Sequence, residues 1–243
     1  MDIQTINFLR QSWFQIAMVG ALSYLIGSIS FSILLTRYFN NKADIRELGS
    51  GNAGFTNVLR SVGVLPAVLT LLGDFGKGMV ACLIGRLIFS MIAVAGVPNF
   101  CITQYGVYIA GVACLVGHVY PCFFGFRGGK AILTAFSMLI MTDWRVAALA
   151  LATFLLAVLF TRLISLGSIL AAVSYPISTF CLTYFCDYLG NGRPVTFGYI
   201  IITTTLSALI SIFVIYKHKK NLFRLLKGEE KPISIAKKGL KES

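Results

Sequence analysis

The chain has 243 residues, of which 57% are apolar and 12% are charged, and its formal net charge is +12. Soluble domains carry about 25% charged residues, so this composition excludes an ordinary soluble protein and indicates helices that lie in a membrane. It predicts an all-α, polytopic membrane helix bundle that forms a single domain over residues 1–243.

Eight apolar blocks follow one another along the chain. They cover residues 13–36, 57–72, 79–97, 105–120, 131–142, 146–161, 165–185 and 196–216. A helix needs about 20 apolar residues to cross the hydrocarbon core of a bilayer, and several of the blocks are long enough to do so.

Basic residues predict the orientation of the chain. Arg10 precedes the first block, whereas Arg37, Lys42 and Arg46 follow it. Because cytoplasmic loops carry an excess of Lys and Arg, the amino terminus is expected outside and the loop 37–56 in the cytoplasm.

The carboxyl-terminal segment, residues 217–243, holds nine of the 21 Lys and Arg residues. In a membrane protein such a basic tail is typical of a cytoplasmic flank beside anionic lipid head groups. We therefore expect this tail to meet membrane lipid and not nucleic acid.

An outside start and a cytoplasmic end require an odd number of crossings. The sequence thus predicts about seven transmembrane helices, with at least one short or re-entrant half-helix. The weakest blocks are 57–72, which contains Pro66, and 131–142, which spans only about 18 Å as a helix. Irregular backbone at membrane depth is tolerated where it is buried or lines a cavity, so the half-helix is expected beside a site.

The first polar cluster follows the first apolar block. Its letters Gly49-x-Gly51-x-x-Gly54 match a dinucleotide-binding loop, but the βαβ unit that such a loop needs is missing. Glycines still allow successive backbone N–H groups to form an anion-binding concavity, and Arg60 can donate to a phosphate or carboxylate. The alternative is a plain turn with an Arg that reaches to the interface. The cluster comprises Ser50, Gly51, Asn52, Gly54, Thr56, Asn57 and Arg60.

The second cluster repeats this design. Gly128, Gly129 and Lys130 stand directly before the short block 131–142, and His118 ends the preceding apolar block. The glycines predict a second anion-binding loop with a point charge attached. His118 either joins this site or only hydrogen-bonds carbonyl groups at its own helix end.

The third cluster follows the last block. His218, Asn221 and Arg224 are three residues apart and so share one helix face, with Gly228 and Glu230 further on. The alternative is an ordinary basic helix at the membrane surface. All three clusters are expected at the cytoplasmic face, where they can converge on one cavity.

Weaker features accompany the clusters. Asp74 and Lys77 are expected to pair within the membrane, and Ser165 and Ser168 mark another cytoplasmic turn. The six cysteines form no CxxC pair, and no HExxH or paired carboxylates stand at ligand spacing. We therefore predict no metal and no cofactor.

Three segments resemble the signature motifs of one family. GSGNAGFTNVLR resembles SGNxGxTNxxR, GHVYPCFFGFRGGKAILT resembles GHxxPxFxxFKGGKGVAT, and HKKNLFRLLKGEEK resembles HxxNxxRLxxGxE. These are motifs of the bacterial acyl-phosphate:glycerol-3-phosphate acyltransferases, and they occur in the family's order.

The resemblance implies an integral inner-membrane enzyme with seven helices, an outside amino terminus and a site that faces the cytoplasm. It implies transfer of a fatty acyl group from acyl phosphate to the 1-hydroxyl of sn-glycerol 3-phosphate. The products are lysophosphatidic acid and phosphate, in the first committed step of phospholipid synthesis. The protein is expected to act as a monomer.

The resemblance also implies roles for the residues of this chain that match positions in the family's motifs. Lys130, Asn221 and His218 are the predicted catalytic residues. The predicted substrate-binding residues are Ser50, Gly51, Asn52, Gly54, Thr56, Asn57, Arg60, His118, Gly128, Gly129 and Arg224. Two positions depart from the motifs: Arg127 replaces a Lys, and Ala131 replaces a Gly, so Ala131 needs a negative φ to avoid strain.

A function of another class fits part of the pattern. A transporter of an anionic, phosphate-bearing solute also presents broken helices to a central site. It predicts an internal repeat, which the sequence does not show, and polar residues along a path across the membrane rather than at one face.

Overall fold

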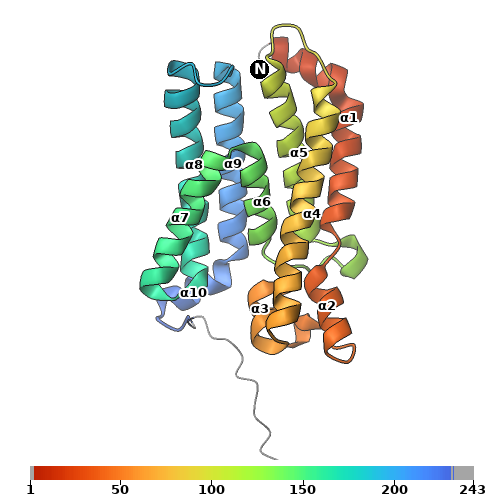
Figure 1. Ribbon diagram of the computed structural model, residues 1–243, viewed down its shortest axis with the longest axis vertical. Helices are drawn as coiled ribbons and strands as arrows, with labels where there is room; N and C mark the ends of the chain where they lie inside the picture. The colour runs from red at the N-terminus through yellow and green to blue at the C-terminus, as the bar shows by residue number, and fades with distance from the viewer. Residues whose placement is uncertain (1–2, 231, 233–243) are drawn as a thin grey trace, which may run out of the picture.

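The computed structural model describes residues 3–230 and 232, and this part of the chain contains helices and loops but no strands. Its long helices are α1 (Ile3–Gly27), α4 (Val64–Ser90), α5 (Asn99–Val119), α7 (Trp144–Thr161), α8 (Ile164–Cys181) and α9 (Phe197–Lys217) (Figure 1). The shorter elements are α2 (Phe31–Phe39), η1 (Ile45–Glu47), α3 (Phe55–Ser61), η2 (Cys122–Phe124), α6 (Ile132–Thr142), the π-helix η3 (Leu182–Leu189) and α10 (Lys219–Leu226). Four members of the predicted basic tail, Lys231, Lys237, Lys238 and Lys241, lie outside the described residues.

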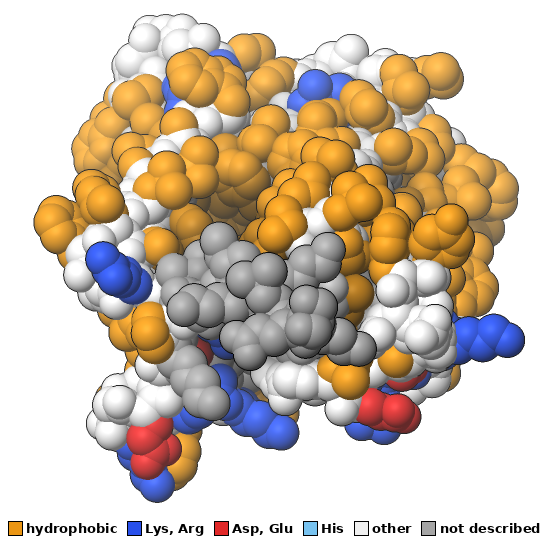
Figure 2. Space-filling view, turned by 60° about the horizontal axis from the view of Figure 1, so that its bottom comes forward, with side chains coloured by type: hydrophobic (Ala, Val, Ile, Leu, Met, Phe, Trp, Pro, Cys, Tyr) orange, Lys and Arg blue, Asp and Glu red, His pale blue; other side chains and the backbone are white. Residues whose placement is uncertain are grey.

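Six helical segments are long and apolar enough to cross a membrane, and α6 is a shorter apolar helix. The fold is therefore the predicted all-α membrane bundle with a short seventh member. Figure 2 shows apolar side chains over most of one face, with Lys, Arg, Asp and Glu gathered toward its lower edge.

The helix α6 is the predicted half-helix. In Figure 1 it starts at the lower end of the bundle and stops part-way up, where α7 begins and returns to the same end. The helices α1, α4, α5, α8 and α9 instead run between the two ends. The described chain consequently starts at one end and finishes at the other, as the odd number of crossings requires.

The prediction that 57–72 and 79–97 are separate blocks is wrong. Asn57 belongs to the short helix α3, while α4 runs without interruption from Val64 to Ser90. Pro66 is the third residue of α4, where the backbone N–H has no intrahelical partner, so proline fits there without breaking the helix.

Small residues let α5 approach its neighbours closely. A Cβ atom at Gly85 of α4 or at Gly106 of α5 would meet the carbonyl oxygen of the other, and one at Gly27 of α1 would meet the carbonyl of Cys114. Such contacts are a main source of helix association in membranes, where burial of apolar surface supplies little drive. They place α5 between α1 and α4, next to the base of α6.

Buried charges tie α4 to α1, and the predicted pairing of Asp74 with Lys77 is confirmed. Lys77 Nζ lies 3.1 Å from Asp74 Oδ1. It also donates hydrogen bonds to the carbonyls of Gly27 at 3.0 Å and Ile29 at 2.7 Å. The ammonium thus satisfies carbonyl groups left open at the end of α1.

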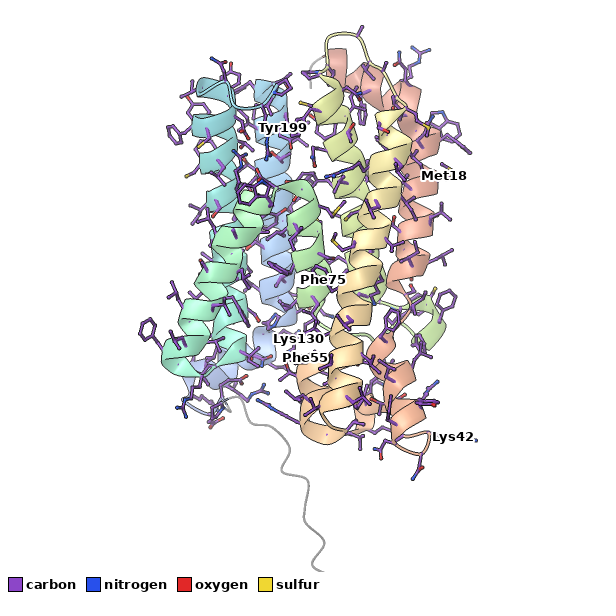
Figure 3. All side chains as sticks on the ribbon, in the orientation of Figure 1. Met18, Lys42, Phe55, Phe75, Lys130 and Tyr199 are labelled. Carbon is purple, nitrogen blue, oxygen red and sulfur yellow. The ribbon has the colours of Figure 1, made fainter. Side chains whose placement is uncertain are left out.

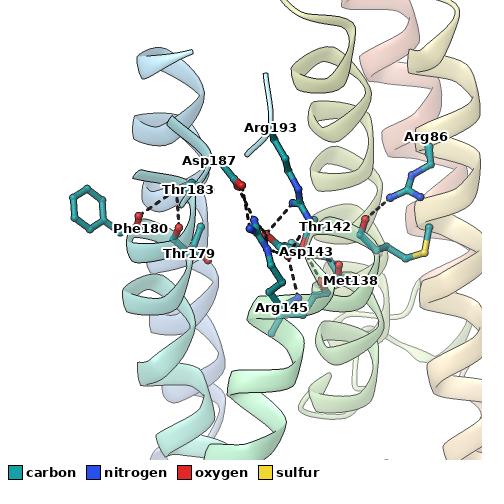
Figure 4. Close-up of polar contacts among 12 residues, drawn as sticks. Arg86, Met138, Thr142, Asp143, Arg145, Thr179, Phe180, Thr183, Asp187 and Arg193 are labelled. Carbon is teal, nitrogen blue, oxygen red and sulfur yellow. Dashed lines mark hydrogen bonds and ion pairs between the residues drawn. The ribbon is translucent and has the colours of Figure 1, made fainter. Parts of the chain in front are cut away.

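A second charged group, which the sequence analysis missed, holds the turn between α6 and α7 (Figure 4). Arg145 pairs with Asp143 at 2.7 Å and with Asp187 of η3 at 2.6 Å. Arg193, after η3, pairs with Asp143 at 2.9 Å. Arg86 of α4 donates to a carbonyl of Met141 at the end of α6. The apex of the hairpin is therefore fixed to both sides of the bundle.

Candidate active site

A cavity of about 610 Å³ lies at the lower end of the bundle and receives side chains from all three predicted clusters. In Figure 3 Phe55 and Lys130, both in its wall, lie together where α3 approaches the base of α6. Its lining includes every predicted site residue: Ser50, Gly51, Asn52, Gly54, Thr56, Asn57, Arg60, His118, Gly128, Gly129, Lys130, His218, Asn221 and Arg224. Residues more than 150 positions apart in the sequence thus line the same cavity.

Asn57 organises the first glycine loop. Its Oδ1 accepts a hydrogen bond from the backbone N–H of Ser50 at 2.9 Å. Its Nδ2 donates to the carbonyls of Ile45, Leu48 and Asn52 at 3.1, 2.9 and 3.1 Å. The side chain is only 3% exposed, so it shapes the loop from behind. Gly51 has φ of +70°, a conformation that favours glycine.

Arg46 fixes this loop to the segment that leads to the second loop. It pairs with Asp44 at 2.7 Å and donates to the Phe124 carbonyl, also at 2.7 Å. The hydrogen bond from Arg46 lowers the pKa of Asp44 to about 2, so the pair stays charged at neutral pH.

The second glycine loop differs from the prediction. The N–H groups of Gly128 and Gly129 donate to the carbonyls of Val119 and His118 at 3.1 and 3.3 Å, so they cannot form an anion-binding concavity. Glycine is needed here for close packing. A Cβ atom at Gly128 would meet the His118 carbonyl, and one at Gly129 would meet His118 Nε2 and the Ala53 carbonyl of the first loop.

Ala131 takes the conformation that the missing glycine would favour. Its φ is +59° and its ψ is +25°, which is the left-handed region, at the position before α6 begins. Ala131 therefore does not have the negative φ that would avoid backbone strain. For a residue with a Cβ atom this conformation costs about 1–2 kcal/mol.

Lys130 connects the second loop to the third cluster. Its Nζ donates to Asn221 Oδ1. Asn221 Nδ2 in turn donates to Ser165 Oγ and to Glu230 Oε1, both at 2.7 Å. Arg224 Nε donates to Glu230 Oε2 at 2.6 Å. Glu230, which the sequence analysis placed in the third cluster but not among the predicted site residues, is therefore the carboxylate at the centre of this network.

Burial and neighbouring charges change how these groups titrate. Burial lowers the pKa of Lys130 to about 8, in part offset by Glu230. Burial and the charge of Lys130 lower the pKa of His218 to about 4. Burial alone would raise the pKa of Glu230, but hydrogen bonds from Arg224, Ser165 and Asn221 lower it. At neutral pH His218 is therefore uncharged. The Lys130 ammonium beside it is charged but loses its proton at a pH only slightly above neutral.

His218 has a defined hydrogen-bond state. Its Nδ1 lies 2.8 Å from the carbonyl oxygen of Val214. Because a carbonyl only accepts, Nδ1 carries the proton and Nε2 keeps its lone pair.

Asp74 and Arg60 complete the polar wall. Asp74 Oδ1 lies 3.5 Å from His118 Nδ1, and both side chains line the cavity. Arg60 Nη2 donates to the Pro232 carbonyl at 3.1 Å, so the segment after α10 lies over the first cluster.

Apolar side chains line the rest of the cavity, close to the membrane-facing helices. They include Leu71 of α4, Ile132 and Leu133 of α6, Phe154 of α7 and Ile164 of α8. A cavity lined by both cations and apolar side chains suits a ligand that has an anionic head and an apolar chain.

Comparisons with known proteins identify the family of the chain. A family model described as glycerol-3-phosphate acyltransferase matches residues 17–228. A glycerol-3-phosphate acyltransferase of Prochlorococcus marinus (strain MIT 9312) is 35% identical over 215 residues, which are 88% of this chain and 95% of that protein. One of Chromobacterium violaceum is 37% identical over 211 residues, 87% of this chain and 91% of that protein.

Two solved structures share the fold. They are crystal structures of PlsY (YgiH), an integral membrane glycerol 3-phosphate acyltransferase, in a glycerol 3-phosphate form and a lysophosphatidic acid form. Their TM-scores are 0.70 and 0.69 at 30% identity, and the match covers 90% of this chain and 96% and 95% of theirs. These relatives are acyltransferases, which does not support the transporter alternative. The chain belongs to the glycerol-3-phosphate acyltransferase family of integral membrane enzymes.

Proposed function

We propose that this enzyme transfers a fatty acyl group from acyl phosphate to the 1-hydroxyl of sn-glycerol 3-phosphate. The products are lysophosphatidic acid and inorganic phosphate, in the first committed step of phospholipid synthesis. The observation that carries the proposal is a single cavity whose lining combines the cations Arg60, Lys130 and Arg224 with apolar side chains. The glycerol 3-phosphate and lysophosphatidic acid forms of PlsY support the same acceptor and product.

Both proposed substrates carry a phosphate, which explains the excess of cations. Arg60 and the first loop, with Ser50, Gly51, Asn52, Gly54 and Thr56, hold one phosphate. Lys130 and Arg224 hold the other. Asn57, Gly128 and Gly129 act from behind, since their polar groups bond to loop and helix backbone.

Acyl phosphate is already activated, so the reaction needs no covalent enzyme intermediate. The hydroxyl of glycerol 3-phosphate attacks the acyl carbon, and an oxyanion develops on the acyl oxygen. Lys130, which Asn221 holds in place through its Oδ1, stabilises this charge as a hydrogen-bond donor, and loss of one such donor typically costs about 2.7–4 kcal/mol of barrier. His218 Nε2 serves as a hydrogen-bond acceptor beside them. Holding both reactants in one cavity supplies the effective molarity.

The acyl chain lies against Leu71, Leu133 and Phe154 and extends between helices toward the lipid. We propose a bacterial inner-membrane location, with the site facing the cytoplasm and the enzyme active as a monomer. The basic residues Lys217, Lys219 and Lys220, which follow the last apolar block, support that orientation. Anionic lipid head groups at the cytoplasmic face attract their side chains.

The test uses the purified full chain in detergent, with phosphate release as the readout. Acyl phosphate with glycerol 3-phosphate is expected to release phosphate, whereas glycerol as acceptor gives none above background. With acyl coenzyme A as donor, the readout is the free thiol of coenzyme A, and none is expected above background. Arg60→Ala is expected to raise KM for glycerol 3-phosphate roughly 10–100-fold, because a lost charge-assisted hydrogen bond costs about 1.5–3 kcal/mol. Lys42→Ala, which removes an exposed cation outside the cavity lining, is the control (Figure 3). Equal turnover with acyl coenzyme A would refute the donor assignment.

A further inference from the structure

The short helix α10 exposes its apolar side chains and turns polar ones toward the cavity. Phe223 and Leu226 are 59% and 79% exposed, and Leu222 is exposed on the same face of the helix. Asn221, on the side that lines the cavity, is only 5% exposed. A helix that packs on a protein core buries its apolar face, so the exposed face of α10 is suited to contact with another apolar phase.

The place of α10 in the fold puts that face at the membrane boundary. The helix α9 is long and apolar enough to cross a membrane, and His218 alone separates it from α10. In Figure 1 α10 lies at the lower end of the bundle, where Asn221 Nδ2 donates to Ser165 Oγ in the first turn of α8. The eight residues of α10 span about 12 Å, so the helix stays close to the lipid head groups.

Lysines that lie over aromatic rings mark the same corner of the molecule. The Nζ of Lys219 lies 4.6 Å from the centre of the Tyr216 ring, and that of Lys227 lies 4.5 Å from the centre of the Phe223 ring. Aromatic side chains, and lysines that extend along apolar surface, are typical of membrane interfaces. Residues 219–227 contain three lysines and no acidic residue, so their charge is complementary to anionic head groups.

The inner face of α10 belongs to the active site. Asn221 Oδ1 accepts a hydrogen bond from Lys130 Nζ, and Asn221 Nδ2 donates to Glu230 at 2.7 Å. Arg224, one turn further, also lines the cavity. A movement of α10 away from the bundle would therefore separate Asn221 from Lys130 and take a cation out of the cavity.

We propose that α10 docks on anionic lipid of the adjacent leaflet and that this docking holds Asn221 and Arg224 in the cavity. The docking is independent of the reaction, whereas its effect on catalysis rests on the proposed function. Leu222, Phe223 and Leu226 enter the boundary between head groups and acyl chains, and the lysines contact anionic head groups. A lipid surface that binds only the docked helix shifts the population toward the complete cavity.

The first experiment measures docking directly, in the full-length chain without substrate. Trp13 and Trp144 are replaced by Phe, and Leu226→Trp supplies a single tryptophan. In nanodiscs of phosphatidylcholine with phosphatidylglycerol, its emission is expected at short wavelength and is quenched by lipids brominated on the acyl chains. Lys220→Trp in the same background is the matched control on the charged side of the helix and is expected to be quenched less. Equal quenching of both variants, or the emission of a water-exposed tryptophan in Leu226→Trp, overturns the docking.

The second experiment compares kcat of the full-length enzyme, with both substrates saturating, in nanodiscs of phosphatidylcholine alone and with phosphatidylglycerol. One lysine near an anionic surface contributes about fivefold to a docking equilibrium. At low salt kcat is therefore expected to be at least about fivefold higher with the anionic lipid, and high salt weakens the difference. Equal kcat of wild type in both lipids overturns the coupling to catalysis.

Variants assign that lipid dependence to α10. Lys227→Gln is expected to lower the ratio of the two kcat values, and Leu226→Gln is expected to lower kcat in both lipids. Lys42→Gln, at an exposed position outside the cavity lining, is the control and leaves the ratio unchanged. An equal effect of Lys42→Gln and Lys227→Gln on the ratio contradicts the assignment. Wild type that is inactive in both lipids refutes the proposed function, while the fluorescence of Leu226→Trp still decides the docking.

Discussion

At the scale of single residues, Lys130 is the cation that the proposed mechanism places beside the developing negative charge. Its Nζ contacts Asn221, and burial lowers its pKa to about 8. As pH rises through that value the ammonium is lost, so kcat/KM is expected to fall above about pH 8. In Lys130→Arg the guanidinium stays charged, and the alkaline limb is expected to move to higher pH even though the plateau is lower. A profile of kcat/KM from pH 6 to 10 for both enzymes checks this; an unmoved alkaline limb in the variant would assign it to another group.

Ala131 gives a test of stability rather than of activity. Its φ of +59° is strained for alanine. Ala131→Gly relieves that strain but gives the unfolded chain more freedom, so the net stabilisation is expected to be about 0.5–1 kcal/mol. Ala135→Gly, one turn further within α6, is the matched control and is expected to destabilise by about 1 kcal/mol. Thermal unfolding in detergent measures both, and lower stability of Ala131→Gly than of wild type would show that the left-handed turn is not strained.

At the scale of elements, the hairpin of α6 and α7 determines where Lys130 stands. Its apex is held by Asp143, Arg145, Asp187 and Arg193, and its base begins at the second glycine loop. Asp187 is only 1% exposed. Removing its partner leaves an uncompensated buried charge.

Arg145→Met is therefore expected to lower the free energy of unfolding by about 3 kcal/mol, at the lower end of the range for a broken buried pair, because Arg145 is 23% exposed. Arg162→Met, at an exposed position after α7, is the control and is expected to change it by less than about 0.5 kcal/mol. Denaturation in detergent, followed by helical circular dichroism, compares the two. Equal stability of both variants would mean that the charged group does not hold the apex.

At the scale of the whole molecule, the membrane bundle and the short helix at 131–142 could be predicted because hydropathy and block length are local properties. The convergence of Ser50, Lys130 and Asn221 on one cavity followed from their common position at block ends. Other features depend on contacts that no local pattern contains. The pairing of Arg145 with Asp187 joins residues from different helices.

The same reason explains the two errors. Whether Pro66 breaks a helix depends on where that helix starts, and it starts only two residues earlier. Whether glycine N–H groups face a ligand depends on their neighbours, and those of Gly128 and Gly129 meet the end of α5. Glycine at these positions indicates close packing as readily as anion binding.

The most direct test of the proposed reaction follows the phosphorus atoms through one turnover. Purified enzyme is given acyl phosphate with a radiolabelled phosphate group and unlabelled glycerol 3-phosphate, and lipid and phosphate are separated. The predicted result is that all consumed label appears as inorganic phosphate, in equal amount to unlabelled lysophosphatidic acid. Label in the lipid, or lipid formed without release of labelled phosphate, would contradict direct acyl transfer from acyl phosphate.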